Sequence, residues 1–269
     1  AEGALRAQFV TPEQGTYSIT DGSGDELFFA AVYERLAPLA SSRLVIANEF
    51  VPDLPAELWA GDAHTAQIGR AGKHLDALDL LPAAFPIEEI LSPRDLRHLK
   101  LLFGIGGLSY GNASVRRSSA VPGPLGHEFW MSASGVDKAN LERVGEHILL
   151  VRGYDADRNT MVLSVPPDVT PNRVSVDAIE HWMIYNEHPE VGAILHVHAW
   201  MDGAGATEIN YPCGTLELAQ SVAEIVRQSP DPGHAVVGQR NHGLTITGES
   251  IDEILERVEG RLVRNVPMD

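Results

Sequence analysis

Three histidines in the C-terminal half of the chain have the spacing of a metal site. His196 and His198 lie two residues apart in an apolar run, residues 192–198, that predicts a strand. Because alternate residues of a strand point to one face, both imidazoles can reach the same ion. His242 follows a second predicted strand and precedes Gly243, where the backbone can turn sharply. Three neutral imidazoles with an open fourth position are typical of a catalytic zinc site.

A carboxylate lies close to this pattern in the chain. Asp177 begins the helix predicted before the His-x-His strand, so it is a candidate fourth ligand or acid/base. His181 lies one helical turn later, where it could orient Asp177 or pack in the core. A His-x-His pair also occurs as stacked or surface histidines. The pattern alone therefore leaves a metal site and a structural role open.

Short strands and helices alternate around these residues. Strands are predicted at residues 16–20, 44–47, 113–117, 128–132, 147–151, 161–165, 192–198 and 235–239. Helices are predicted at residues 25–40, in part of 57–80, and at 94–103, 177–187, 216–228 and 250–263. Pro38 is expected at or beyond the end of the first helix. This order favours an α+β or a three-layer α/β/α domain.

Prolines divide the chain into two predicted parts. Pro82 and Pro86 indicate a linker. Residues 1–90 are therefore predicted to form an N-terminal extension of unknown role, and residues 91–269 to form the metal-binding domain.

Composition excludes several classes of partner. The 269 residues carry a formal net charge of −17, which disfavours binding to nucleic acid or to anionic membranes. No apolar run approaches the roughly 20 residues of a membrane span, and residues 1–9 lack the apolar core of a signal peptide. The single cysteine, Cys213, can form no disulfide within the chain. A reducing compartment, the cytoplasm, is therefore predicted.

Five segments carry a family resemblance. They are GLSYGNASVR (107–116), FWMSASGV (129–136), VSVDAIEHWMIY (174–185), ILHVHA (194–199) and the stretch 210–248, which contains a Gly-Thr-x-x-Leu helix and an Asn-His-Gly strand end. In this order and spacing, residues 92 to about 262 resemble the class II aldolase/adducin family. The resemblance implies a three-layer α/β/α fold with a central, mostly antiparallel sheet, here with a smaller N-terminal α/β segment.

The resemblance also implies roles for individual residues. It makes His196, His198 and His242 the zinc ligands. Asp177 stands where the sugar-phosphate aldolases of the family carry a glutamate that is both ligand and acid/base, and an aspartate is more like the ribulose-phosphate 4-epimerase branch. The family's phosphate pocket maps to small donors and open backbone N–H groups, which suit an oxyanion. These residues are Ser109, Asn112, Ser134, Gly135 and Ser175.

The chain departs from the family pattern in three places. Val176 replaces the second serine of a Ser-Ser pair, which removes a phosphate donor. Residues 198–211 form a shorter segment than the aldolases use to build the wall of the active site. The chain also stops soon after the helix that follows His242. Tyr211 and Glu208, in the short segment, are candidate second proton donors, although a structural or surface role fits each of them as well.

These observations predict a zinc-dependent lyase of the aldolase type. Its substrate would be a small hydroxycarbonyl compound, with a sugar phosphate as one candidate, and the metal would stabilise an enediolate. An epimerase, a decarboxylase or an iron-dependent oxygenase on the same fold is the alternative, because three histidines and a carboxylate can hold iron or another divalent metal. A non-catalytic, adducin-like binding module is the third possibility. The resemblance implies a homo-oligomer, a tetramer in most of the family.

Overall fold

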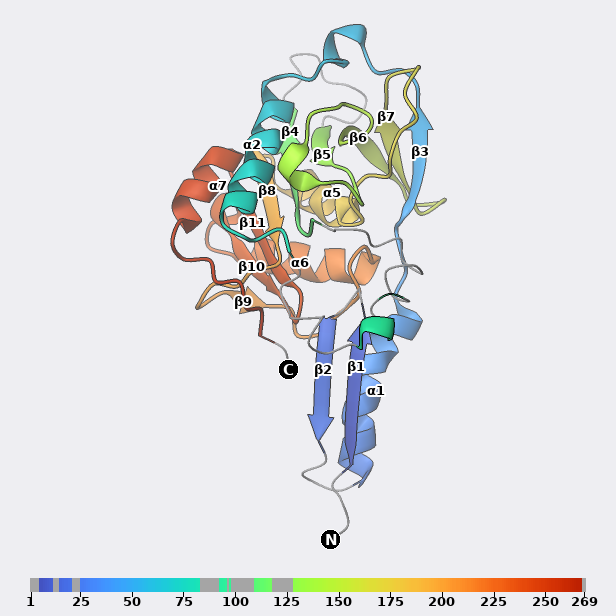
Figure 1. The fold of residues 1–269 in the computed structure, drawn as a ribbon, viewed down its shortest axis with the longest axis vertical. Coiled ribbons are helices and arrows are strands. Elements are labelled where there is room, and N and C mark those ends of the chain that lie inside the picture. The colour runs from blue at the N-terminus through green and yellow to red at the C-terminus, as the bar shows by residue number, and fades with distance from the viewer. Residues whose placement is uncertain are drawn as a thin grey trace.

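A large sheet forms the centre of the molecule (Figure 1). The computed structural model describes residues 5–11, 15–20, 25–82, 92–95, 97, 109–117 and 128–267. Among these residues, nine strands join in the order β3-β7-β6-β5-β4-β8-β11-β10-β9. The bounds of the strands are β3 Ala47–Val51, β4 Asn112–Arg116, β5 Phe129–Ser132, β6 Ile148–Asp155, β7 Thr160–Ser164, β8 Ala193–Val197, β9 Gly205–Ala206, β10 Val236–Gln239 and β11 Gly243–Gly248. Neighbouring strands are antiparallel except in the pairs β3–β7 and β10–β9, so the predicted mostly antiparallel sheet is confirmed.

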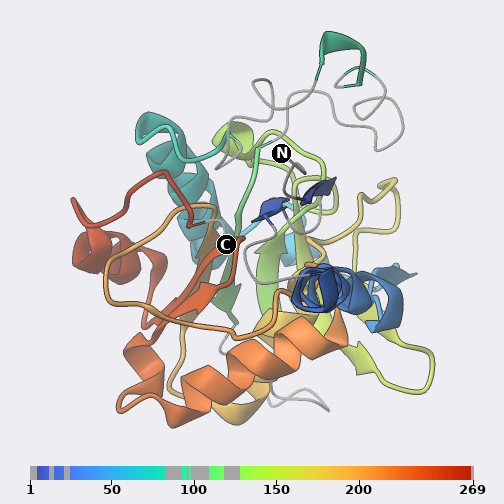
Figure 2. The same cartoon turned by 90° about the horizontal axis from the view of Figure 1, so that it is seen from below.

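Helices cover both faces of this sheet. Helices α2 (Ala63–Ala77) and α7 (Ile251–Val258) pack on one face, and α5 (Ala178–Glu187) and α6 (Leu216–Gln228) on the other (Figure 2). Each face has its own apolar core, because alternate residues of a strand point to opposite sides. In β8, Leu195 and Val197 face α2 and α7, whereas Ile194 faces α5 and α6. The predicted three-layer α/β/α arrangement is confirmed.

The first part of the chain contributes to two regions. Strands β1 (Arg6–Thr11) and β2 (Gly15–Thr20) pair with each other, and α1 (Asp25–Ser41) contacts β2. Together they form an arm that projects from the body (Figure 1). In contrast, β3 pairs with β7, and α2 packs against β4 and the short helix η2 (Lys138–Asn140). The predicted domain boundary near residue 90 stays a prediction.

Several predicted elements need correction. The buried strand expected at residues 44–47 is wrong: β3 starts at Ala47, and Leu44 and Ile46 are exposed, because this run crosses the start of α6 before it reaches the sheet. Pro38 lies inside α1, in its last turn, and not at or beyond its end, so the helix lacks the hydrogen bond that an N–H at this position would donate to the carbonyl four residues earlier. The last helix ends at Val258, since Gly260 adopts a left-handed backbone conformation.

Three strands were not predicted, and one predicted helix cannot be compared. Strand β11 has the alternation of apolar residues and threonines that is typical of a half-buried strand, but no strand was predicted there. Strands β1 and β9 were not predicted either. Most of the helix predicted at residues 94–103 lies outside the described residues. Within the part of the chain that the structure describes, no helix is long and apolar enough to span a membrane.

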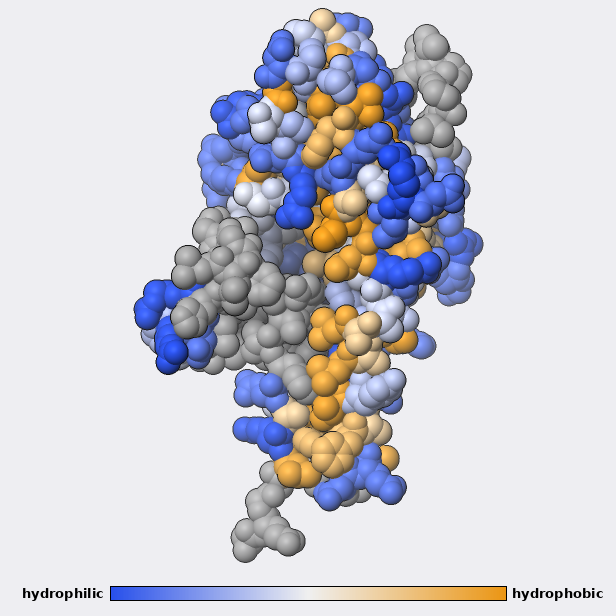
Figure 3. All heavy atoms as spheres, turned by 90° about the vertical axis from the view of Figure 1, so that its right-hand side faces the viewer, coloured by the Kyte–Doolittle hydropathy of each residue, from blue (hydrophilic) through white to orange (hydrophobic). Residues whose placement is uncertain are grey.

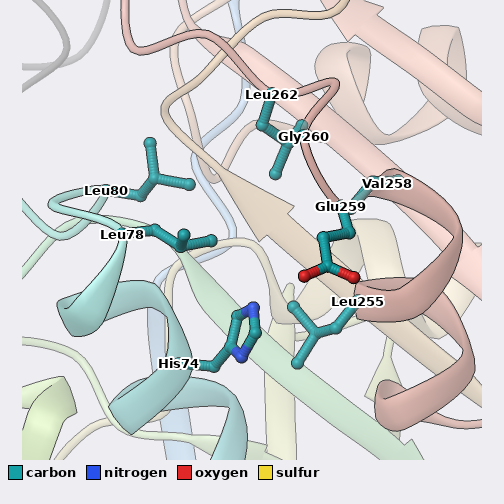
Figure 4. Close-up of a pocket in the computed structure, with 8 residues that line it drawn as sticks. All are labelled: His74, Leu78, Leu80, Leu255, Val258, Glu259, Gly260 and Leu262. Carbon is teal, nitrogen blue, oxygen red and sulfur yellow. The ribbon is translucent and has the colours of Figure 1, made fainter.

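A small cavity lies among the described residues, away from His196, His198 and His242. It has a volume of about 110 Å³ and lies between α2 and α7 (Figure 4). Apolar side chains form most of its wall, together with His74 and Glu259. The lining residues are His74, Leu78, Leu80, Leu255, Val258, Glu259, Gly260 and Leu262.

Helix α2 is fixed to the sheet at its first turn. The Asp62 carboxylate accepts hydrogen bonds from the backbone N–H groups of His64 and Thr65, and the Asp62 backbone N–H donates to the Thr65 hydroxyl. The indole N–H of the buried Trp130 donates to the same carboxylate at 3.1 Å. Burial alone would raise the pKa of Asp62, but these hydrogen bonds hold it below the usual value.

The substitution Asp62→Ala tests this anchor. It should lower the free energy of unfolding by about 1–2 kcal/mol at neutral pH, measured by urea denaturation. Because the folded pKa of Asp62 is lowered, its stabilising effect is present above the unfolded pKa and fades as the pH falls below about 4. Asp76→Ala, at an exposed position of the same helix, is the matched control. Equal stability of the Asp62 variant and the wild type at neutral pH would contradict the role.

Candidate metal centre

The first histidine lies in the middle of the sheet. Strand β8 runs between β4 and β11, and its register places His196 beside Asn112 on one side and Thr245 on the other. By strand alternation these three side chains share the face that α5 and α6 cover. His196 is completely buried there.

The other two histidines reach the same point from the ends of β8 and β10. His198 follows β8, and His242 occupies the tight turn between β10 and β11, where its backbone N–H donates to the carbonyl of Gln239 at 3.0 Å. One ligand nitrogen from each of the three rings lies within 4.8 Å of the others. The centroid of the His242 ring is 5.0 Å from that of His196 and 4.4 Å from that of His198. The structure therefore brings the predicted trio together.

This convergence requires a glycine beside His242. A Cβ atom on Gly243 would lie 2.2 Å from the carbonyl oxygen of Val197, inside any tolerated contact. Asn241, before His242, adopts the left-handed conformation with φ of 58°. The two residues around His242 thus permit β11 to lie directly against the end of β8.

The histidines present free nitrogen lone pairs. The Nδ1–H of His196 donates to the carbonyl of Leu244 at 3.1 Å, which fixes the tautomer and leaves Nε2 as the acceptor. Nε2 of His196 and Nε2 of His242 are buried and have no hydrogen-bond partner among the described residues. Burial lowers the pKa of both side chains to about 4, and burial with the neighbouring His242 and His196 lowers that of His198 well below its usual value. Neutral imidazoles with unpaired buried nitrogens fit a divalent metal ion.

Asp177 lies at the edge of this cluster. Its Oδ2 atom is 4.0 Å from Nε2 of His196 and accepts a hydrogen bond of 2.7 Å from the side-chain amide of Asn112. Its Oδ1 atom is buried and forms no hydrogen bond within the described part of the chain. Burial raises the pKa of Asp177, against the opposing influence of His242, Asn112 and Lys138. One carboxylate oxygen is thus oriented by Asn112 while the other remains available.

A polar layer continues from this point between the sheet and α5. The Oγ atom of Ser114 lies 2.7 Å from Nδ1 of His181 and 2.8 Å from the hydroxyl of Tyr185. His181 therefore pairs with Ser114, and it does not orient Asp177, which Asn112 holds instead. On the other side, Glu180 accepts hydrogen bonds from Thr245 and Gln239. Burial and the nearby charge of Asp177 raise the pKa of Glu180 well above its usual value.

The predicted phosphate-binding residues are in different surroundings. Asn112 contacts Asp177, as described. The hydroxyl of Ser109 accepts a hydrogen bond from the backbone N–H of Lys138 at 3.0 Å. Ser134 is half-buried, Ser175 is buried, and Gly135 is exposed with φ of 71°. Their joint role in binding phosphate stays a prediction.

The proton donors predicted in the short segment lie in other surroundings than the histidines. Tyr211 packs at the edge of the apolar core under α5 and α6. Glu208 is exposed, and its backbone carbonyl accepts a hydrogen bond from Arg240. Among the described residues, neither side chain forms a hydrogen bond to His196, His198 or His242. A catalytic role for Tyr211 stays a prediction.

Two residues near the site were missed by the sequence analysis. The ring centroid of Tyr110 lies 4.9 Å from that of His198. Lys138 is almost completely buried, and its charge affects the pKa of Asp177 and of His196. Tyr110 lies inside the segment 107–116, at a position to which the resemblance assigns no role. Lys138 lies in a polar segment that reads as an exposed turn.

The fold and the site define a class: an α/β/α protein with three histidines at the end of a central strand that could hold a metal ion. A model of the family described as Class II Aldolase and Adducin N-terminal domain matches residues 96–206. This match confirms the predicted resemblance to the class II aldolase/adducin family. His196 and His198 lie inside the matched residues, whereas His242 lies beyond them.

Solved structures of similar proteins include several aldolases. An L-fuculose 1-phosphate aldolase is 18% identical, with 75% of this chain and 84% of that chain covered and a TM-score of 0.46. The L-fuculose-1-phosphate aldolase from Thermus thermophilus is 20% identical, with 75% and 86% covered and a TM-score of 0.39. An aldolase II superfamily protein from Pseudomonas syringae is 17% identical, with 77% and 74% covered and a TM-score of 0.45. Comparison with curated protein sequences gives no match.

The double substitution His196→Ala, His198→Ala tests the centre directly. Wild-type protein should carry about one divalent ion per chain, and the variant should carry almost none, because one remaining imidazole cannot hold the ion. Plasma mass spectrometry of purified protein measures both. The matched control is His147→Ala, His234→Ala, which removes two half-buried histidines outside the cluster and should leave the metal content unchanged. A folded wild type that binds no metal, even when supplied with it, would exclude the centre.

Proposed function

We propose that this chain is a zinc-dependent lyase of the aldolase type that acts on a small hydroxycarbonyl compound. The observation that supports it most is the convergence of His196, His198 and His242 beside the carboxylate of Asp177. The Nε2 atoms of His196 and His242 are buried and have no hydrogen-bond partner in the described part of the chain. Three nitrogen ligands that leave a position open are the usual set for catalytic zinc. The family match of residues 96–206 agrees with this chemistry. We also propose a cytoplasmic location, because a single cysteine fits a reducing compartment.

His196, His198 and His242 would hold the ion. Bound there, zinc would act as a Lewis acid that stabilises negative charge developing on the oxygens of a hydroxycarbonyl substrate. The carbonyl of Leu244 keeps His196 in the tautomer that offers Nε2 to the ion. The burial of His196 and His242 excludes water from their side of the centre, which strengthens electrostatic effects on a bound substrate.

Asp177 is the group we assign to proton transfer. The Asn112 amide fixes one of its oxygens and leaves the other without a hydrogen-bond partner in the described part of the chain. Burial raises its pKa, which brings a carboxylate closer to the range in which it can both accept and release a proton. The distance of 4.0 Å between its Oδ2 atom and Nε2 of His196 supports a role beside a substrate that the ion would hold.

Asp177→Asn separates proton transfer from metal binding. The amide has nearly the same shape but cannot accept a proton. Turnover of a hydroxycarbonyl substrate should therefore fall by roughly 10²–10⁴-fold while the metal content stays near that of the wild type. Cleavage of a panel of hydroxycarbonyl compounds, with and without phosphate, provides the assay. Asp231→Asn, at an exposed carboxylate, is the control.

The outcomes separate the candidate functions. Full turnover by the Asp177 variant would remove this residue from the mechanism. Iron in place of zinc in the purified protein would favour the oxygenase alternative. No metal and no turnover would leave the adducin-like binding module.

We also propose that the chain forms a homo-oligomer through its arm, which consists of β1, β2 and α1. Phe29, Tyr33 and Leu36 recur at helical spacing on α1, and the first two are 60% and 71% exposed. Figure 3 shows apolar residues gathered along this part of the surface. A two-stranded sheet with one helix buries too little apolar surface to be stable alone, which supports coverage by a second copy.

The double substitution Phe29→Ser, Tyr33→Ser tests the arm. Sedimentation of the wild type should give the mass of an oligomer, and the variant should shift toward the monomer because the apolar contact is lost. Ile209→Ser, at an exposed apolar residue outside the arm, is the control and should not shift. A monomeric wild type at high concentration, or a variant with an unchanged mass, would contradict the proposal.

A further inference from the structure

Lys138 is a buried cation beside the metal centre that the proposed function does not use. It begins η2 and is only 6% exposed. Its Nζ atom donates a hydrogen bond of 2.8 Å to the carbonyl of Ser109, and its backbone N–H donates to the hydroxyl of the same serine. Its charge alters the pKa of Asp177, His196 and His198, so the ammonium lies within electrostatic range of the centre.

The hydrogen bonds of this ammonium are incomplete. A protonated lysine has three N–H donors, and the described residues provide one acceptor, a neutral carbonyl. No described carboxylate lies within ion-pair distance of Nζ. Burial lowers the pKa of Lys138 to about 8, and the charge of Asp177 opposes this, so most of the population is protonated at neutral pH. A buried cation of this kind is costly unless an anion joins it.

The net charge of the centre also favours an anionic ligand. The three imidazoles are neutral because their pKa values are lowered, and the raised pKa of Glu180 favours its neutral form. Asp177 carries at most one negative charge. A divalent ion together with Lys138 would bring three positive charges into a buried space. An anionic ligand is the simplest way to balance the excess.

Helix α2 determines where Lys138 lies. A Cβ atom on Gly72 would lie 1.8 Å from the Lys138 carbonyl oxygen, and one on Gly69 would lie 3.0 Å from the carbonyl of Leu141. The two glycines are three residues apart, so they share one face of the helix. Only a helix surface without side chains at these positions lets η2 approach so closely. Helix α2 precedes the residues that match the family model.

We propose that Lys138 binds an oxyanion of the substrate, a carboxylate or a phosphate group, and that α2 positions it through Gly69 and Gly72. The inference rests on the proposed function, since the oxyanion belongs to the hydroxycarbonyl compound. It gives the N-terminal part of the chain a role: α2 supplies the support for a substrate-binding group. Lys138 is the binding residue, and the two glycines are positioning residues.

Calorimetric titration of anions into the protein tests the proposal. The probes are inorganic phosphate and glycolate, each titrated into metal-loaded and into metal-free protein. Lys138→Met, which keeps the length of the side chain and removes the charge, should weaken binding of the preferred probe at least about tenfold in both forms. Its metal content should stay unchanged. Gly72→Ala should weaken binding in the same direction, although Lys138 is present. Lys73→Met, at an exposed lysine on α2, is the matched control and should bind like the wild type.

The outcomes distinguish this proposal from the proposed function. Preference for phosphate or for glycolate identifies the oxyanion. Unchanged affinity in Lys138→Met, or a wild type that binds neither probe at millimolar concentration, overturns the assignment of Lys138. A folded Gly72→Ala variant that binds like the wild type overturns the role of α2, and if that variant does not fold, Lys138→Met still decides the binding role. If the proposed function fails, the wild type will contain no metal. The titrations of metal-free protein would still test the role of Lys138.

Discussion

The arrangement of the site depends on the buried Nε2 atom of His196. This atom lies in the centre of the sheet, and no residue that the structure describes forms a hydrogen bond with it. Leaving such a group unsatisfied is costly, which is why this atom supports the proposal of a bound ion. The surrounding polar groups follow from it. Leu244 fixes the tautomer, Asn112 turns Asp177 toward the same point, and His242 adds a second unpaired nitrogen.

One face of the sheet forms an apolar core, and the other carries the polar residues of the site. The face under α2 and α7 is apolar along β4, β8 and β11, and it provides a continuous core. The opposite face of the same strands carries Asn112, Ser114 and Thr245, which form hydrogen bonds to Asp177 at the start of α5 and to His181 and Glu180 within it. Because strand residues alternate, one short sequence such as that of β8 serves both purposes. The apolar face stabilises the strand that holds His196 in place.

Sequence patterns predicted the parts of this structure that repeat a simple rule. The apolar run at residues 192–198 predicted β8 and placed His196 and His198 two residues apart, and the neighbouring patterns singled out His242 and Asp177. Lys138 could not be predicted, because its burial depends on α2, more than sixty positions earlier in the chain. Ser114 could not be predicted as the partner of His181 either, since this contact follows from the register of β4 and β8. Strand β11 was not predicted although its threonines alternate with apolar residues, and the buried partners of their hydroxyls, Glu180 and the carbonyl of Pro232, follow only from the fold.

The strand at one end of the sheet is very short, and this limits unwanted growth of the sheet. Strand β9 consists of Gly205 and Ala206 and pairs only with β10. An exposed sheet edge is a template on which another chain can add a strand, and the danger grows with the number of unpaired peptide groups. Two residues offer very few such groups. This end of the sheet is therefore protected against the edge-to-edge aggregation to which a nine-stranded sheet would otherwise be prone.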